Sequence, residues 1–396
     1  MVVSGCASQQ APAVATVPMV ATASQANTGA SAPTSPASAT VSASTTPVLA
    51  VAPELRFPPV KAGRSVPGNI PFTGPDGRLA DDIQAYAIEV AQTRQVPLGH
   101  VESLLQNATY DAEAARLMSP SKTRIRRSWV TYRKRFVDPI RTRAGVEFWQ
   151  QHRSTLDAVT KAYGVPQSVI VAIIGVETVY GRYTGSFRVL DALATLGFRY
   201  PDPTRPERDQ LFRDQLADLI LLDYQGRLNA REVTGSFAGA MGLPQFMPGS
   251  LLRYAADGDG DGRITLGSST EDAITSVARF LRLHGWVPGL PVFAPVNLTP
   301  QAQKLVDGGL EPTLSWQQLQ QSGATARVTA QPDNTWQNYP LGVVNLVDEP
   351  RNTVEYRTGT PNFFAITHYN RSYFYASSVA DLANTLAERL GYCRAY

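Results

Sequence analysis

A single apolar segment constrains the fold more than any other part of the chain. Residues 169–176 read VIVAIIGV; Pro166 before them suits a first helical turn, and Gly181 after them suits a position past a helix end. The segment therefore predicts a helix that is apolar on every side and lies inside the protein. Its apolar part is far below the roughly 20 residues that a membrane-spanning helix needs.

One acid, Glu177, stands at the end of this buried helix. Burial and the negative end of the helix dipole both disfavour its charged form, so its pKa is expected to be raised. Such an acid can hold a proton near neutral pH and donate it, as general acid catalysis requires. The alternative is structural, with Glu177 reaching solvent or pairing with a cation such as Arg182. The segment alone leaves both interpretations open.

Composition limits the classes of function. The chain has 396 residues, which predicts about two domains, or one domain with embedded subdomains. Its net charge of +3 is too small to indicate a nucleic-acid partner. The two cysteines, Cys6 and Cys393, argue against a disulfide framework, and the four histidines lack the close spacing of a zinc site.

The first 55 residues differ in character from the rest. Val3-Ser4-Gly5-Cys6 resembles a bacterial lipobox, in which the cysteine is lipidated, although the basic and long apolar parts of a signal peptide are missing. The alternative is an ordinary N-terminal cysteine. Alanine, serine, threonine and proline dominate the residues that follow, and no charged residue occurs before Glu54. This composition predicts a disordered linker that could tether an anchored domain.

Apolar residues at helical spacing predict most of the folded part. Helices are expected at residues 81–94, 98–107, 147–163, 189–196, 209–224, 270–284 and 379–390. The strongly basic residues 121–143, with Trp129, Tyr132 and Phe136 at helix spacing, predict an amphipathic helix. Its basic face is either solvated or forms the wall of a cleft for an acidic polymer, with Tyr132 as a contact.

Two further segments carry candidate ligand-binding groups. Residues 236–250 read SFAGAMGLPQFMPGS, a tight turn that suits a close approach of backbone groups and Gln245 to a ligand, or a purely structural turn. Residues 257–265 read DGDGDGRIT, which matches the start of an EF-hand loop. Position 12 of that loop is Ser268, so the closing carboxylate is expected from Glu271 or Asp272. A Ca²⁺ site is predicted, with an acidic glycine-rich turn as the alternative.

The C-terminal third changes character. Short alternating runs at residues 291–296 and 342–347 predict strands, so residues 286–360 are expected to form a small β-containing subdomain. Residues 361–376 are rich in aromatic side chains, and Tyr369, Asn370 and Tyr375 stand close to a polar turn.

Taken together, six motifs resemble the lytic murein transglycosylase B family. They are IIGVETVYG, LDALATLGFRYP, GSFAGAMGLPQFMPGS, DGDGDG, HGW and PNFFAITHYNRS, in this order, and the resemblance covers residues 56–396. The resemblance implies a mainly α (α+β) fold. Its parts would be an outer α subdomain (residues 56–155, completed by 361–396), a lysozyme-like catalytic core with the ion loop (156–285), and the small β subdomain inserted at 286–360.

The resemblance also assigns roles to residues. It implies that Glu177 is the catalytic acid. The implied saccharide contacts are Tyr132, Ser236, Gln245, Phe280, Tyr369, Asn370 and Tyr375. The implied ion ligands are Asp257, Asp259, Asp261, the Arg263 carbonyl and Asp272. Two residues depart from the family pattern, because Phe280 replaces the common tyrosine and Gly249 replaces the usual serine.

The implied function is cleavage of the glycan strands of peptidoglycan without water, with one glutamate acting first as acid and then as base. The product would carry a 1,6-anhydro-N-acetylmuramic acid end, and no cofactor would be needed for the chemistry beyond a structural Ca²⁺. The alternatives are a hydrolytic muramidase, and a non-catalytic peptidoglycan-binding lipoprotein. We expect a monomer in the periplasm of a Gram-negative bacterium, anchored to the outer membrane by lipid on Cys6.

Overall fold

The computed structural model describes residues 57–392, except residues 64, 122 and 329–333. Helices make up most of this part and the strands are short, so the predicted mainly α class is confirmed. Cys6 and the predicted linker lie outside the described residues. Among the described residues no single helix has the length and apolar character of a membrane span. The helices at residues 153–163 and 167–178 have that length and apolar character only when taken as a pair, and the pair is bent by 115°.

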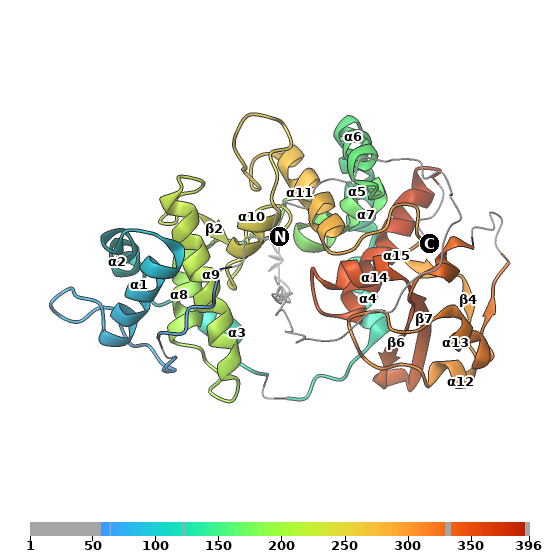
Figure 1. The fold of residues 1–396 in the computed structure, drawn as a ribbon, viewed down its shortest axis with the longest axis horizontal. Helices are drawn as coiled ribbons and strands as arrows, with labels where there is room; N and C mark the ends of the chain where they lie inside the picture. The colour runs from blue at the N-terminus through green and yellow to red at the C-terminus, as the bar shows by residue number, and fades with distance from the viewer. Residues whose placement is uncertain (1–56, 64, 122, 329–333, 393–396) are drawn as a thin grey trace, which may run out of the picture.

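A first group of helices lies at the left of Figure 1. In this group α1 and α2 pack on α9, α3 packs on α8, and α8 packs along α9. The bounds are α1 Asp81–Arg94, α2 Leu98–Asn107, α3 Ala112–Met118, α8 Val189–Phe198 and α9 Pro206–Tyr224.

A second group surrounds the predicted buried helix at the right of Figure 1. Here α5, α6 and α15 pack on α7, and α4 and α14 pack on α15. The bounds are α4 Trp129–Phe136, α5 Pro139–Gln151, α6 Arg153–Tyr163, α7 Gln167–Thr178, α14 Pro361–Thr367 and α15 Tyr373–Arg389. As predicted, α7 is apolar all round, and its residues from Ser168 to Val176 are buried.

Helices α10 and α11 connect the two groups, since α10 packs on α9 and α11 packs on α6 and α7, and a short strand pair lies beside α8. Strands β1 and β2 pair antiparallel, with Phe187 opposite Gly235, and α11 packs on α6, α7 and α10. The bounds are β1 Phe187–Arg188, β2 Thr234–Gly235, α10 Pro248–Tyr254 and α11 Thr270–Leu283.

The β-containing part follows α11 in the chain. Strands β6 and β7 form an antiparallel hairpin around the 3-10 helix η2, and β3 pairs with the other edge of β7. This part has a hydrophobic cluster of its own, around Leu290, Leu319 and Trp336. The bounds are β3 Phe293–Ala294, β4 Val296–Asn297, α12 Pro300–Gln303, α13 Trp316–Gln321, β5 Thr325–Ala326, η1 Thr335–Asn338, β6 Gly342–Asp348, η2 Glu349–Arg351 and β7 Thr353–Gly359.

Three expectations about local structure were wrong. Residues 121–143 are not one helix, because an irregular segment precedes α4, and the Asp138 carboxylate caps a new helix that begins at Pro139. Residues 147–163 are not one helix either, since α5 ends at Gln151 and α6 begins at Arg153. The run 291–296 contains β3 and the first residue of β4 instead of one strand, because Pro295 interrupts it.

The helix contacts divide the predicted outer α subdomain. Residues 81–118 pack on α8 and α9, whereas α4 and α5, at residues 129–151, pack on α7 and α15. Residues 119–121 and 123–128 are irregular, join the two sets and cross between the two groups in Figure 1. Which of these sets fold as independent units stays a prediction.

Candidate active site

Glu177 lies in the last turn of α7, and its carboxyl contacts a tyrosine of α15. The Tyr375 hydroxyl donates a hydrogen bond of 2.5 Å to Oε1 of Glu177. Burial raises the pKa of Glu177 to about 7, although the hydrogen bond from Tyr375 works in the opposite direction. Among the described residues no ion pair joins Glu177 to Arg182, while Glu177 itself is partly exposed.

Three tyrosines lie within electrostatic reach of this carboxyl. Burial raises the pKa of Tyr132 to about 12, and it raises the pKa values of Tyr369 and Tyr375 well above their usual range. A negative charge on Glu177 adds to the shift in each case. The tyrosines therefore remain neutral hydroxyl donors at any physiological pH, and Glu177 is the group among these four that titrates near neutrality.

Ion pairs fix α4, and so Tyr132, against α15. Arg133, next to Tyr132, and Arg357 of β7 both bind the carboxylate of Asp381 on α15. The Tyr132 ring then packs on Phe374 with 5.4 Å between centroids. Arg133 of the basic stretch is thus engaged in a structural ion pair that leaves Tyr132 near the carboxyl, and both interpretations of the basic face stay predictions.

The segment 236–250 is a turn held by its own polar groups. The Ser236 hydroxyl accepts from the Ala240 amide at 3.0 Å, and Met241 pairs with Phe246 across the turn. Gln245 has a φ of 51°, and its side-chain nitrogen donates to the carbonyls of Thr184 and Gly242 at 3.1 and 2.9 Å. The amide nitrogen of Gln245 is therefore committed to the protein, and Oε1 is the atom left for a ligand.

Thr178 joins this turn to the end of α7. Its buried hydroxyl donates to the carbonyl of Leu243 at 3.0 Å and accepts from the amide of Gly181 at 3.0 Å. The residue after the candidate acid thus fixes the distance between α7 and the turn that carries Gln245. The sequence analysis missed Thr178, since one hydroxyl after a glutamate carries no distinguishing pattern.

The backbone after Thr178 is strained. Val179 and Tyr180 both adopt left-handed conformations, with φ of 50° and 59°, whereas Gly181 alone was expected to end the helix. Non-glycine residues in this region cost about 1–3 kcal/mol each, and a β-branched valine is especially unfavourable there. Strain of this kind persists only where the surrounding structure enforces it, and it clusters at functional sites. The surrounding structure therefore fixes the backbone conformation of the residues that follow Glu177.

Tyr369 and Phe280 form a floor beside the site. The Tyr369 hydroxyl donates to the carbonyl of Pro244 at 2.8 Å, and the ring stacks on Tyr375 with 6.4 Å between centroids. Phe280 lies 4.8 Å from the Tyr369 ring and is buried. Phenylalanine suits this position because the ring packs among apolar groups. Asn370 follows Tyr369 and is partly exposed.

Gly249 has a packing reason in this chain. A Cβ at this position would lie 2.7 Å from Oδ2 of Asp218, and closer still to the guanidinium of Arg253. Those two side chains form an ion pair of 3.4 Å, and Asp218 also binds Arg94 at 3.0 Å. The glycine that replaces the usual serine leaves room for this network.

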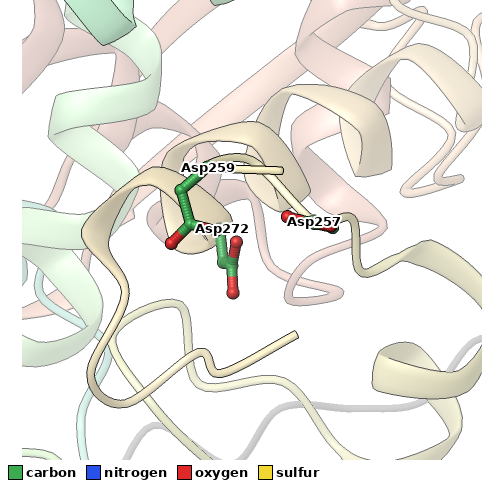
Figure 2. Close-up of side chains that lie close together, drawn as sticks. All are labelled: Asp257, Asp259 and Asp272. Atoms are coloured by element: carbon green, nitrogen blue, oxygen red, sulfur yellow. The ribbon is translucent and has the colours of Figure 1, made fainter. Parts of the chain in front are cut away.

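Three aspartates converge at the predicted ion loop. Carboxylate oxygens of Asp257, Asp259 and Asp272 all lie within 4.8 Å of one another, and Figure 2 shows their side chains close together. Asp272 is the acid that the structure brings in, and Asp261 is outside this group. Like charges at this spacing repel, so a cation is their natural counterpart, and an all-oxygen donor set suits Ca²⁺. The residues present fit the predicted ion.

Backbone amides hold these carboxylates in place. Buried Asp272 accepts from the amides of Gly258 and Thr265 at 2.7 and 2.6 Å, and Asp257 accepts from Gly260 and Gly262. The hydroxyl of Ser269 donates to Asp259 and lowers the pKa of that carboxyl. The loop is thus organised around charged carboxylates before any cation is considered.

Comparisons with known proteins agree with this geometry. Residues 79–384 match the family model described as "Transglycosylase SLT domain". The chain is 40% identical over 260 residues to the membrane-bound lytic murein transglycosylase B of Escherichia coli (strain K12), which covers 66% of this chain and 68% of that protein.

Solved structures show the same fold. The catenated lytic transglycosylase SltB1 from Pseudomonas aeruginosa is 37% identical, covering 78% of this chain and 98% of its own, with a TM-score of 0.69. The Escherichia coli transglycosylase Slt35 in complex with calcium is 34% identical, covering 81% and 97%, with a TM-score of 0.67. SltB3 from Pseudomonas aeruginosa, 26% identical over 78% and 80% with a TM-score of 0.64, is solved with NAG-NAM-pentapeptide. The predicted lysozyme-like class is therefore confirmed. The chain belongs to the lytic murein transglycosylase B family and is a peptidoglycan lytic transglycosylase.

Proposed function

We propose that the enzyme cleaves the β-1,4 bond between N-acetylmuramic acid and N-acetylglucosamine with Glu177 as its acid. The observation that carries this proposal is the partly buried carboxyl with a pKa of about 7 that accepts a hydrogen bond from Tyr375. A pKa near the working pH gives both a sufficient protonated fraction and a sufficient driving force for proton transfer. A carboxyl with an ordinary pKa would have lost its proton at neutral pH.

In the first step the Glu177 proton passes to the bridging oxygen, and the bond from C1 of N-acetylmuramic acid to that oxygen breaks. An oxocarbenium-like state develops at C1, as in other glycosidic cleavages. In the second step the Glu177 carboxylate takes the proton of the C6 hydroxyl while that oxygen attacks C1. The 1,6-anhydro ring closes, no water is consumed, and Glu177 ends protonated.

One carboxylate suffices for this sequence, whereas hydrolysis generally uses two that flank the bond. Only burial and the Tyr375 hydrogen bond shift the pKa of Glu177, so no carboxylate among the described residues acts on it strongly. This supports transglycosylation over the hydrolytic muramidase. A raised pKa at a strained turn also supports an enzyme over a non-catalytic binding lipoprotein.

Three of the proposed saccharide contacts, Tyr132, Tyr369 and Tyr375, lie within electrostatic reach of this carboxyl. Tyr132 would supply its hydroxyl and ring, and Gln245 would supply its Oε1. The hydroxyl protons of buried Tyr369 and Tyr375 bind Pro244 and Glu177, so these two residues would act by holding the site in shape. Asn370 and the Ser236 hydroxyl are the remaining polar candidates, while buried Phe280 would act through the ring of Tyr369.

The test is mass spectrometry of products from purified sacculi, with wild-type enzyme and E177Q side by side. Wild type is expected to release fragments with anhydro ends, and E177Q is expected to lose about 10²–10⁴-fold in rate, the usual contribution of a general acid. Products with reducing ends alone would favour the muramidase. Release by neither protein would favour the binding lipoprotein, and unchanged release by E177Q would remove Glu177 from its role.

We also propose that Asp257, Asp259 and Asp272 bind Ca²⁺ as a structural ion, with Asp261 and the Arg263 carbonyl completing the loop's ligands. The convergence of three carboxylates supports this, as does the solved calcium complex of Slt35. The ion would compensate the charge of the loop and would take no part in the proton transfers of Glu177.

The proposed location is the periplasmic face of the outer membrane, with lipid on Cys6 and the enzyme acting as a monomer. The lipobox-like Val3-Ser4-Gly5-Cys6 supports the anchor, and so does the membrane-bound nature of the relative from Escherichia coli. Mass spectrometry of the N-terminal peptide from the native host tests it. An unmodified Cys6 in membrane-extracted protein would contradict the anchor.

A further inference from the structure

The ring of Tyr180 occupies a slot between two helices. A Cβ built on Gly175 of α7 would lie 2.6 Å from Cζ of Tyr180, and a Cβ built on Gly145 of α5 would lie 2.9 Å from the same atom. Real Cβ atoms essentially never come this close to another heavy atom. Two glycines on adjoining helices therefore leave the space that the end of the Tyr180 side chain fills, and Phe148 packs on the ring with 5.3 Å between centroids.

The hydroxyl of Tyr180 does not explain the residue. It is buried and has no hydrogen-bond partner among the described residues. A buried hydroxyl without a partner costs free energy of folding, so it opposes the stability of the fold. The hydroxyl end of the side chain is nevertheless the part that lies between Gly145 and Gly175, because its oxygen is the atom nearest to a Cβ built on either glycine.

The slot encloses the end of α7 on which Glu177 stands. Gly175 precedes Glu177 by two residues, and Tyr180 follows it by three. Glu177 therefore lies in a short segment of chain whose two ends, Gly175 and Tyr180, are in contact. Arg141 of α5 adds a second contact, because its Nε donates to the carbonyl of Gly175 at 2.7 Å. After Glu177 the backbone adopts left-handed conformations at Val179 and Tyr180. Such conformations persist only where the surrounding contacts hold them in place.

We propose that Tyr180 is a positioning residue for Glu177: its side chain, whose hydroxyl end lies between Gly145 and Gly175, fixes the end of α7 and so keeps the Glu177 carboxyl against the Tyr375 hydroxyl. The proposal rests on the proposed function, in which Glu177 is the acid. Without the ring, the strained turn relaxes and the carboxyl leaves its apolar surroundings for water. The pKa of Glu177 then falls towards its ordinary value.

The experiment compares Y180F, Y180L and G145A with wild type by kcat, KM and the pH dependence of kcat on purified glycan strands. Y180F keeps the ring with its contact to Phe148 and removes only an oxygen that has no hydrogen-bond partner among the described residues, so kcat within about twofold of wild type and an unchanged alkaline limb are expected. Y180L empties part of the slot, and the Cβ of G145A displaces the end of the Tyr180 side chain, while it also meets Cδ2 of Leu386 on α15. Both are expected to lower kcat at least tenfold and to move the alkaline limb to lower pH, with KM little changed.

A matched control is G99A on α2, where an added Cβ meets nothing within 4 Å. It should leave both kcat and the alkaline limb at wild-type values. Thermal unfolding of every variant separates positioning from folding. If Y180L does not fold, G145A and the double variant G145A/Y180F test the same slot from the other helix, and the double variant should regain part of the kcat lost in G145A.

Three results would overturn the inference. The first is an unchanged alkaline limb in folded Y180L and G145A, even with lowered stability, because a merely structural residue gives that outcome. The second is a Y180F variant as impaired as Y180L. The third is impairment by G99A equal to that of G145A. Each of these differs from failure of the proposed function, in which E177Q itself retains release of glycan fragments.

Discussion

The Tyr375 hydroxyl and the Glu177 carboxyl form a hydrogen bond of 2.5 Å between α15 and α7, two helices that are almost 200 residues apart in the chain. The bond favours the charged form of Glu177, while burial favours the neutral form by more. The pKa of about 7 is the balance of these two effects, so each can be altered separately.

Replacing Tyr375 tests the first effect. Y375F removes the hydrogen bond to the carboxylate, so the pKa of Glu177 rises. Because the protonated acid is the active form, the alkaline limb of activity is expected to move to higher pH, by about one unit for a bond to a charged group. The pH profile of kcat measures this. The neighbouring Y373F, whose hydroxyl binds the Gly309 carbonyl instead, is the control and should keep the wild-type limb.

Glu177 also makes folding stability depend on pH. Its pKa in the folded state, about 7, is above the ordinary value of 4.5. Between these values the folded protein binds more protons than the unfolded one, so stability falls as pH rises and the loss is complete above pH 7. The shift corresponds to at most roughly 3 kcal/mol. E177Q is therefore expected to be more stable than wild type at pH 8 and similar to it at pH 4.

Urea unfolding of both proteins at the two pH values checks this prediction. E113Q, which alters an exposed carboxylate of α3 paired with Arg116, should show no gain at pH 8. An E177Q protein that gains equally at both pH values would indicate that charge on Glu177 is not the cause.

The ion loop predicts a response to calcium. An ion that binds only the folded protein adds about 2.7 kcal/mol to stability at a concentration of one hundred times its Kd. The melting temperature should therefore rise with calcium and fall with a chelator, as differential scanning calorimetry can measure. D257N should weaken this response while leaving the apo protein folded, because Asp257 is exposed. A melting temperature that ignores both calcium and chelator would contradict the site.

The network beside Gly249 predicts an unfavourable effect of the residue usual in the family. G249S introduces a Cβ that collides with Asp218 and Arg253, so stability is expected to fall by about 1–3 kcal/mol, as in other overpacked sites. Denaturant unfolding measures the loss. The double variant G249S/R253A should recover part of it, and equal losses in the single and double variants would show that the collision with Arg253 is not responsible.

Sequence patterns predicted much of this molecule because they report on local physics. Apolar periodicity gave the bounds of α1 and α2, and the apolar run before Glu177 gave a buried helix with an acid at its end. The alternating aspartates of the ion loop likewise predicted a cluster that the structure forms in part. In each case the residues that carry the signal are neighbours in the chain.

What the sequence could not predict depends on contacts between distant segments. The break between α5 and α6 has no glycine or proline to mark it, and the reach of Tyr375 to Glu177 depends on the packing of α15 on α7. The left-handed Val179 runs against its own preference, so no propensity argument could have found it. Gly145 looks like any helix glycine until the Tyr180 ring is seen beside it.

Helix α11 connects the ion loop with Tyr369, one of the proposed saccharide contacts. Helix α11 starts two residues before Asp272 and carries Phe280, two turns further on, into contact with Tyr369. Loss of the proposed Ca²⁺ would loosen the N-terminal end of α11. Phe280, near the other end of the helix, would then hold the ring of Tyr369 less firmly. Calcium depletion should therefore lower the affinity for glycan strands at temperatures well below those that melt the protein.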